Sequence, residues 1–138
     1  MSEADVIEQL VEYMNVLMMG VSVFFTIVSA YVVALYAFLA RAGFFLKLFA
    51  FAFFTAAVGF LIVFFLGAQT QHEGLLQTLY LIEQTHGLSP AGQAALANSA
   101  GGIDARIETV MWAVGLGFYI AAFFLTFFPR LTLRATTD

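Results

Sequence analysis

The side chains of this sequence best suited to binding a metal or a haem are its two histidines, His72 and His86. His72 is followed by Glu73 at the end of an apolar segment, where it could ligate a metal, haem or chlorophyll. Such ligands come with convergent partners, and none stands at a recognisable spacing. The absence of Cys also excludes a thiolate site. We therefore predict no metal-binding or cofactor-binding residue, and interpret His72 as an interfacial histidine and His86 as part of a helix C-terminus.

Catalytic groups are equally absent from the interior of the apolar segments, which contains no Asp, Glu, Lys, Arg or His. Proton relays, ion pathways and voltage sensors normally place such residues inside the membrane. No nucleophile–base pair, glycine-rich phosphate loop or pair of carboxylates is visible. The sequence therefore predicts a protein that is not an enzyme, with no catalytic residue and no small-molecule substrate. Its net charge of −4 argues against a nucleic-acid partner.

Polar side chains recur along the first apolar segment, mostly at intervals of seven residues. They are Asn15, Ser22, Thr26, Ser29 and Tyr36. At 100° per residue, these five lie within roughly 80° of one another on a helix. The stripe could line a pore or a ligand groove, or it could pack helices together through small and hydroxyl residues. We favour packing, and expect Ser29→Leu to disturb assembly and the same change at Val28 to be nearly silent.

Small residues gather on particular faces of the other two apolar segments. In the second segment the face includes Thr55 and Gly59, with Ala52 and Ala56 beside them. The third segment has two such faces. One consists of Ala113, Gly117 and Ala121, and the other of Gly115, Ala122 and Thr126. Small faces let helix backbones approach closely in a membrane. We expect one face to pack against the other helices of this chain and the second to be available to another protein.

The elements that position these residues are three long helices. Hydrophobic residues make up 62% of the chain and charged residues only 10%, which is too apolar for an ordinary soluble domain. Charges are absent from residues 13–40, 48–71 and 109–129. About 20 apolar residues suffice for a helix to cross the hydrocarbon of a bilayer. The sequence predicts an all-α integral membrane protein, residues 1–138 forming a single membrane domain with three transmembrane helices.

The five basic residues predict the orientation of these helices. Arg41 and Lys47 lie in the first connection, and Arg130 and Arg134 follow the third helix, whereas Arg106 lies on the other side. Cytoplasmic loops carry an excess of Lys and Arg. We therefore expect the N-terminus outside the cytoplasm and the C-terminus inside, in the bacterial inner (plasma) membrane.

The outer connection, residues 72–108, is predicted to contain short amphipathic helices. One includes Leu75, Leu79 and Ile82 and ends near Gly87, and a second begins at Ser89-Pro90, with Ser89 as its N-cap. A break at 101–102 precedes Asp104, which is expected to cap the third long helix. About forty residues cannot build a core of their own without disulfides or metal. We expect the connection to lie on the membrane surface or against a partner.

Two functions follow from these features. The uncharged helices, the second small face and the coreless connection favour an accessory or scaffolding subunit of a larger membrane protein assembly. Its partners would be membrane lipid and other membrane protein subunits, or further copies of the chain. The alternative is a homo-oligomeric pore or lesion-forming protein, because the number and orientation of the helices resemble those of the three-span phage holins. A third interpretation, a subunit binding a pigment or a quinone, rests on the 17 Phe residues and His72.

Overall fold

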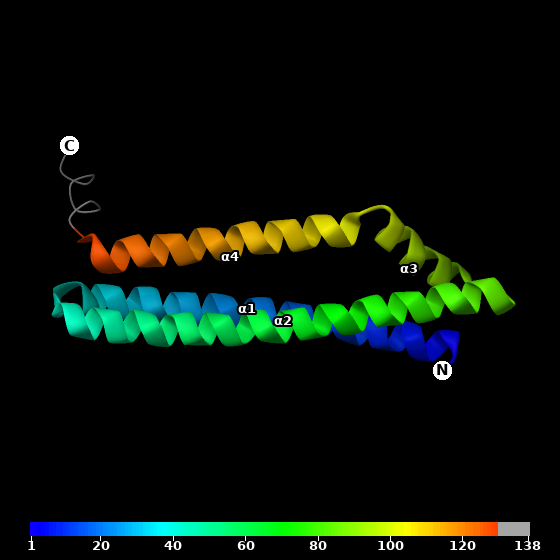
Figure 1. Ribbon diagram of the computed structural model, residues 1–138, viewed down its shortest axis with the longest axis horizontal. Coiled ribbons are helices and arrows are strands. Elements are labelled where there is room, and N and C mark those ends of the chain that lie inside the picture. Colours follow the sequence, from blue (N-terminus) through cyan, green and yellow to red (C-terminus); the bar gives the residue numbers. More distant parts are fainter. Residues whose placement is uncertain (130–138) are drawn as a thin grey trace. The chain divides into compact units, whose positions relative to one another are not determined.

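The computed structural model describes residues 1–129 and is built from helices (Figure 1). They are α1 (Glu3–Ala37), the short 3₁₀ helix η1 (Leu39–Arg41), α2 (Phe44–His86), α3 (Pro90–Ala100) and α4 (Ile103–Phe127). The described part of the chain contains no strand. Three of the helices, α1, α2 and α4, are long and apolar enough to cross a membrane, which confirms the predicted all-helical fold with three such helices. Arg130 and Arg134 lie outside the described residues.

The helix α1 starts with a reciprocal cap. The Asp5 N–H donates to the Ser2 hydroxyl oxygen (3.3 Å), and the Ser2 N–H and hydroxyl donate to the Asp5 carboxylate (2.8 and 2.7 Å). These bonds from Ser2 hold the pKa of Asp5 below its ordinary value. The helix then continues without interruption to Ala37, so the predicted amphipathic start is the first part of a longer helix.

The helix α2 is longer than the segment predicted to cross the membrane. The stretch with Leu75, Leu79 and Ile82, predicted as a separate short helix, is the last part of α2, which ends at His86. Gly87 follows with a φ of 76°, a conformation that side chains rarely adopt. At 1.5 Å per residue, the 43 residues of α2 span about 64 Å, roughly twice the thickness of the hydrocarbon.

The helix α3 begins where the sequence predicted a helix start. Pro90 occupies the first turn, and the Gly92 N–H donates to the side chain of the N-cap Ser89 (3.4 Å). The helix ends at Ala100, and a two-residue turn leads into α4, with Gly102 at a φ of 70°. Asp104 lies inside the first turn of α4, and its recorded side-chain bond is to His72, so the prediction that it caps the helix is wrong.

The helices contribute to two compact units. Unit 1 contains residues 1–21 and 62–110, and unit 2 contains residues 22–61 and the described residues from 111 onward. Unit 1 therefore holds the first part of α1, the last part of α2, all of α3 and the start of α4. Unit 2 holds the remaining parts of α1, α2 and α4.

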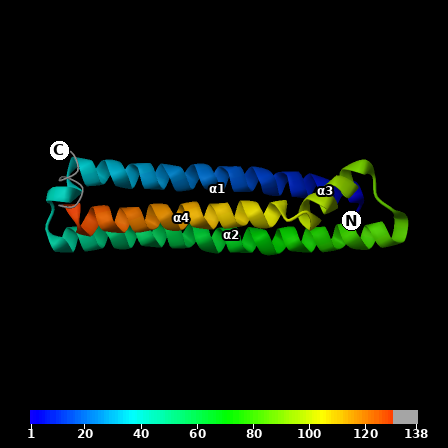
Figure 2. The same cartoon turned by 90° about the horizontal axis from the view of Figure 1, so that it is seen from above.

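Aromatic stacking joins the three helices of unit 2, which run side by side (Figures 1 and 2). The Tyr31 ring of α1 stacks on the Phe54 ring of α2 with centroids 4.4 Å apart, and Phe54 stacks on Tyr119 of α4 with centroids 6.0 Å apart. The Tyr31 hydroxyl donates to Thr126 (2.7 Å), because the Thr126 hydroxyl already donates to the Ala122 carbonyl. Tyr31, Phe54, Ala122 and Thr126 are all buried, so this stack is the centre of unit 2.

Unit 1 is held by a small core and a polar clamp. Val6 of α1 and Leu79 of α2 are fully buried. The Glu3 carboxylate accepts from the Ser89 N–H (3.0 and 3.2 Å) and from the Ser89 hydroxyl, which ties α1 to the start of α3 (Figure 2). A Cβ at Gly92 would clash with the Glu3 carboxylate, so glycine makes room for this clamp.

Part of the predicted outer connection is buried within the chain itself. Leu79 is fully buried, and Leu75 and Ile82 are half-buried. Whether the membrane surface or a partner covers the remaining exposed residues of this connection stays a prediction.

Gly20 marks a close approach of α1 and α2 in unit 1. A Cβ at this position would overlap the ring of Phe65 on α2. Gly20 is buried, whereas an added Cβ would meet open space at Gly59, Gly115 and Gly117. The close approach therefore occurs at a glycine outside the small faces that the sequence indicated.

Candidate functional site

The most polar contact between the long helices is a junction at Tyr13, His72 and Asp104 in unit 1. The Tyr13 ring of α1 stacks on the His72 ring of α2, with centroids 4.3 Å apart and planes 15° apart. His72 Nε2 lies 3.3 Å from Oδ2 of Asp104 in the first turn of α4. His72 therefore contacts two other helices at once, and its side chain is only 16% exposed.

The surroundings of this junction are acidic. The carboxylates of Glu73, Asp104 and Glu108 all act electrostatically on the Tyr13 hydroxyl. His72 Nδ1 is buried and has no hydrogen-bond partner.

This arrangement favours holding helices together over binding a ligand. One ring nitrogen of His72 faces Asp104, and the other is shielded from solvent. Within residues 1–129, no group of three or more His, Cys, Asp or Glu side chains is placed to hold a metal ion. Structural metal sites usually need four ligands. We therefore interpret the junction as a polar tie between α1, α2 and α4.

Sequence reasoning missed the partners of His72. They lie on other helices, and no short motif links them to it. One signal was available, because each residue lies within two helical turns of an end of a charge-free segment. Tyr13 begins the first segment, His72 follows the second, and Asp104 and Glu108 precede the third. Helices that cross the same membrane must bring such ends to one level. The junction is therefore consistent with a shared membrane boundary for the three helices.

The polar stripe of α1 lies on the exposed side of the helix. In unit 2, Ser22, Thr26, Ser29 and Tyr36 are all exposed, Tyr36 to 86%, and Asn15 is exposed in unit 1. The buried residues of α1 in unit 2 include Val28, Tyr31 and Leu35. At 100° per residue, the two sets are centred about 150° apart.

The stripe therefore does not pack against the other helices of this chain. Val28, expected to tolerate leucine, is 6% exposed and belongs to the buried face, whereas Ser29 is exposed. The expectation for these two variants is reversed for the isolated chain. Whether the stripe meets a partner protein stays a prediction.

The small face of α2 also lies mainly outside the packed interior. Thr55 is exposed and Gly59 is half-buried, while Phe54, Val58 and Leu61 are buried. Thr55 still makes one contact with α4, a hydrogen bond of 2.9 Å between its hydroxyl and that of Tyr119. Aromatic and branched side chains, rather than small ones, form the contact surface of α2.

The two small faces of α4 differ in exposure. Ala122 and Thr126 are buried, so this part of the face packs against the chain's own helices, whereas Gly115 is half-buried and a Cβ there would meet open space. The other face is exposed. It consists of Ala113, Gly117 and Ala121. Whether the exposed face meets another protein stays a prediction.

No protein-family model matches this chain, and neither a curated protein nor a solved structure matches it. The class of this protein is therefore assigned from its own sequence and structure. The chain is an all-helical protein with three helices long and apolar enough to cross a membrane.

Proposed function

We propose that this chain is a non-enzymatic accessory or scaffolding subunit that crosses a membrane three times and packs against other membrane protein subunits. The observation that carries the proposal is the direction of the small and hydroxyl faces. Each of the three long helices exposes small or hydroxyl residues, namely Ser22 and Ser29 on α1, Ala52 and Ala56 on α2, and Gly117 on α4.

Contact with lipid alone does little to stabilise these exposed small and hydroxyl faces. Lipid tails are as apolar as leucine, so there is no hydrophobic drive between helices in a bilayer. Small residues stabilise a membrane helix when a second helix packs closely over them, and hydroxyl groups do so when they find a hydrogen-bond partner. A chain surrounded only by lipid gains neither the close packing nor the hydrogen bonds. Exposed faces of this kind on all three helices therefore favour contact with further helices.

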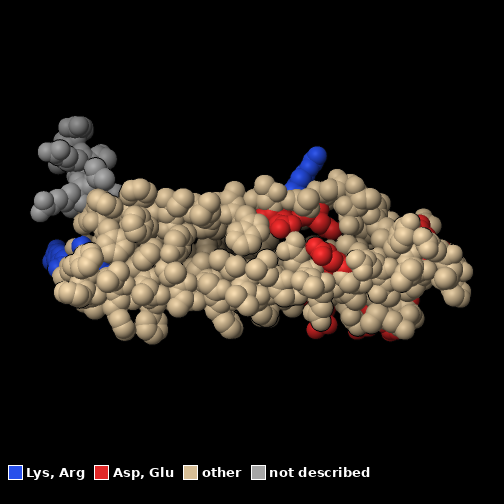
Figure 3. Space-filling model, viewed as in Figure 1, with Lys and Arg blue, Asp and Glu red and all other residues tan. Residues whose placement is uncertain are grey.

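The proposed orientation places the N-terminus outside the cytoplasm, in a bacterial inner membrane. Arg41 is the last residue of η1 and Lys47 lies in the first turn of α2, whereas Arg106 lies in the first turn of α4 and is the one basic residue of the 72–108 segment. The acidic residues of unit 1 show as red patches in Figure 3. Because Lys and Arg rather than acids determine orientation, the proposal depends on the basic residues.

A substitution at Gly117 tests this function. A Cβ added there meets no atom within 4 Å, so Gly117→Leu should leave the chain's own packing intact. It should nevertheless block a helix from packing closely on the outer face of α4. We expect the detergent-corrected mass of the purified wild-type assembly to exceed 15.1 kDa and to fall to that of one chain in Gly117→Leu.

The matched control is Leu116→Phe, because Leu116 is exposed on a different side of α4. This variant should keep the wild-type mass. A folded wild-type chain that is alone in mild detergent would refute the proposal.

The exposure of the α1 stripe also favours a second candidate, a homo-oligomeric pore lined by these hydroxyl groups. A ring of identical chains could direct Ser22, Thr26 and Ser29 toward a water-filled centre. The same purification separates the two candidates. An assembly containing only this chain, with ion flux in reconstituted vesicles that Ser29→Leu abolishes, would favour the pore. An assembly with a second protein and no flux would favour the accessory subunit.

A further inference from the structure

The exposed face of α1 follows a longer repeat than the hydroxyl stripe alone. Beginning near the helix start, exposed residues recur at alternating intervals of three and four. They are Asp5, Glu8, Glu12, Asn15, Met19, Ser22, Thr26, Ser29, Val33 and Tyr36. We call this set the α1 seam. An average spacing of 3.5 residues is that of the contact positions in a left-handed coiled coil, which also describes many pairs of membrane helices.

Each half of the α1 seam is uncovered. In unit 1 the seam residues are all exposed, Met19 to 68%. In unit 2 they are exposed as well, Val33 to 65% and Tyr36 to 86%. The seam is therefore a side of α1 that a further helix could approach without disturbing the buried residues.

Three uncharged polar side chains of the seam lack a hydrogen bond to any residue that the structure describes, whereas Asp5 is bonded to Ser2. The Thr26 hydroxyl donates to the Ser22 carbonyl of its own helix (2.9 Å). The side chains of Asn15, Ser22 and Ser29 make no hydrogen bond to any described residue. A polar group facing hydrocarbon without a partner costs free energy, and an amide in a membrane helix favours association for this reason.

The charge of the seam distinguishes between the molecules that could bind to it. Its first three residues are Asp5, Glu8 and Glu12, and α1 contains no Lys or Arg to offset them. Copies of the chain inserted in the same direction would place these carboxylates against one another. Like charges across a helix pair are unfavourable, and anionic lipid headgroups would be repelled in the same way.

We propose that the α1 seam binds a helix of a different membrane protein. That helix carries small or hydroxyl residues along its span and Lys or Arg beside Asp5, Glu8 and Glu12. The proposal rests on the function proposed above and identifies which helix meets the partner. Complementary charges at the edge of a coiled-coil contact select the partner and its register, while the hydroxyl positions allow the two backbones to approach.

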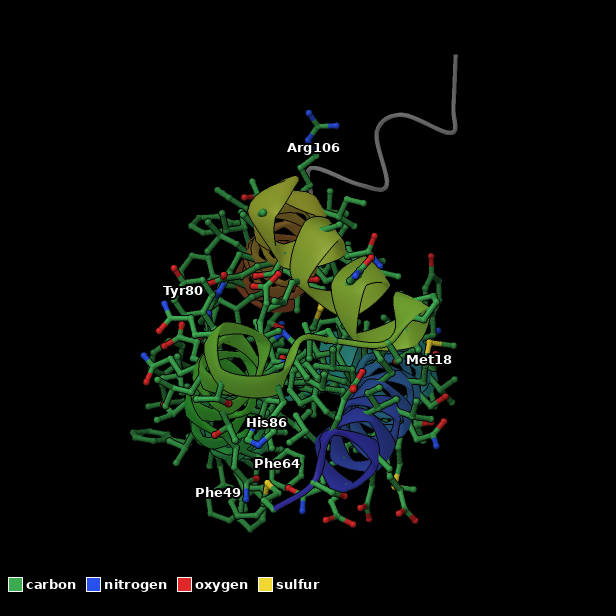
Figure 4. All side chains as sticks on the ribbon, turned by 90° about the vertical axis from the view of Figure 1, so that its right-hand side faces the viewer. Met18, Phe49, Phe64, Tyr80, His86 and Arg106 are labelled. Carbon is green, nitrogen blue, oxygen red and sulfur yellow. The ribbon has the colours of Figure 1, made fainter. Side chains whose placement is uncertain are left out.

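The test uses the full chain with two synthetic helices in neutral phosphatidylcholine vesicles. Both helices have a leucine-rich span with alanine and serine at the contact positions. One has lysines and the other has glutamates at the positions opposite Asp5, Glu8 and Glu12. The chain has no Cys, so Tyr80→Cys provides a single site for a fluorophore on α2, where the side chain is exposed (Figure 4). Energy transfer to a labelled helix measures association.

We expect the lysine helix to bind on the order of tenfold more tightly than the glutamate helix at low salt, because three exposed ion pairs contribute modestly to affinity. The difference should shrink at high salt. Glu8→Lys should weaken binding of the lysine helix several-fold. Glu83→Lys is the matched control, since Glu83 is an equally charged, exposed residue on α2, and it should leave binding unchanged.

Equal binding of the two helices, or equal effects of Glu8→Lys and Glu83→Lys, would overturn the proposal. So would efficient disulfide formation between two copies of Ser29→Cys, because it would place a second chain on the seam. If these results occur while Gly117→Leu still dissolves the native assembly, the accessory function stands and only the assignment to α1 fails. If the wild-type chain is alone in mild detergent, both proposals fail.

Discussion

Unit 1 and unit 2 are built from parts of the same long helices, but different contacts hold each together. In unit 2 the centre is a stack of aromatic rings, and its recorded side-chain hydrogen bonds involve hydroxyl groups, such as that of Tyr31 with Thr126. In unit 1 charged and titratable groups join the helices, through Glu3 with Ser89 and His72 with Asp104. This difference is the one expected if unit 2 lies in hydrocarbon and part of unit 1 lies in water. Ionised groups are expensive in the first solvent and easily hydrated in the second.

The two kinds of contact also respond to different changes of condition and sequence. Ring packing is independent of pH and salt, whereas contacts made by carboxylates depend on both. We therefore expect substitutions to loosen the two units separately. Amide hydrogen exchange, measured segment by segment on the detergent-solubilised chain, reports each unit by itself.

The largest effect should come from Leu79→Ala in the core of unit 1. Leu79 is fully buried, and removing a buried leucine side chain typically costs about 2–5 kcal/mol. Exchange should accelerate in residues 72–100 and remain slow in residues 44–61. Leu81→Ala is the control, because Leu81 is 61% exposed, and it should change little. Equal effects of the two variants would contradict the assigned core.

A somewhat smaller effect is expected in unit 2 from Ala122→Leu. Ala122 is 3% exposed, and inserting a larger side chain into a packed interior costs about 1–3 kcal/mol. The melting temperature of the solubilised chain should fall. Ala121→Leu introduces the same side chain on the exposed face and should leave the melting temperature of the single chain unchanged. A comparable loss in both would mean that the two faces of α4 are assigned incorrectly.

The clamp of unit 1 should respond less strongly. Glu3→Gln removes the charge that accepts hydrogen bonds from Ser89, which should cost about 1 kcal/mol at a partly exposed site. Faster exchange of the Ser89 and Gly92 amides would register the loss. Glu8→Gln removes an equal charge from an exposed residue of the same helix and should not affect these amides.

The smallest effect should be the pH dependence of the α1 start. The pKa of Asp5 is lowered in the folded chain by its bonds to Ser2. A lowered pKa means that the stabilisation is present above the ordinary value of 3.8 and disappears as the pH falls through the folded value. Fraying of the first turn, followed by NMR between pH 6 and pH 2, should therefore increase only in acid. Ser2→Ala should already be frayed at pH 6, and a pH-independent wild-type turn would contradict this assignment.

The sequence was sufficient to predict three apolar helices and the breaks near Gly87 and at 101–102, but not that α2 continues without interruption to His86. Charge-free runs of 20 residues or more have few alternatives to a membrane helix, and Ser89-Pro90 and Gly87 are strong local signals. The side of each helix that is buried was harder to predict. In water, polar residues mark the exposed face, but in a membrane the same residues are expected at helix contacts.

Which face of each helix is buried depends on how the side chains of neighbouring helices fit together, and the spacing of residues in the sequence does not show this fit. Tyr31 and Phe54 are neighbours because their rings stack across two helices, and no spacing rule brings them together. His72 and Asp104 are likewise paired only by the fold. The two small faces of α4 were recognisable from spacing, but which one faces inward depended on Tyr31 reaching Thr126.

The contact between Glu3 and Ser89 has a consequence for the synthesis of the chain. Its two residues are 86 positions apart, and they belong to the first and the third helix. Ribosomes add about 5–20 residues per second, so Ser89 is made roughly 4–17 seconds after Glu3. During that interval the N-terminal turns of α1 lack the clamp, although α2 is already synthesised before Ser89. The start of α1 can therefore reach its final contacts in unit 1 only after α2 and Ser89 have been made.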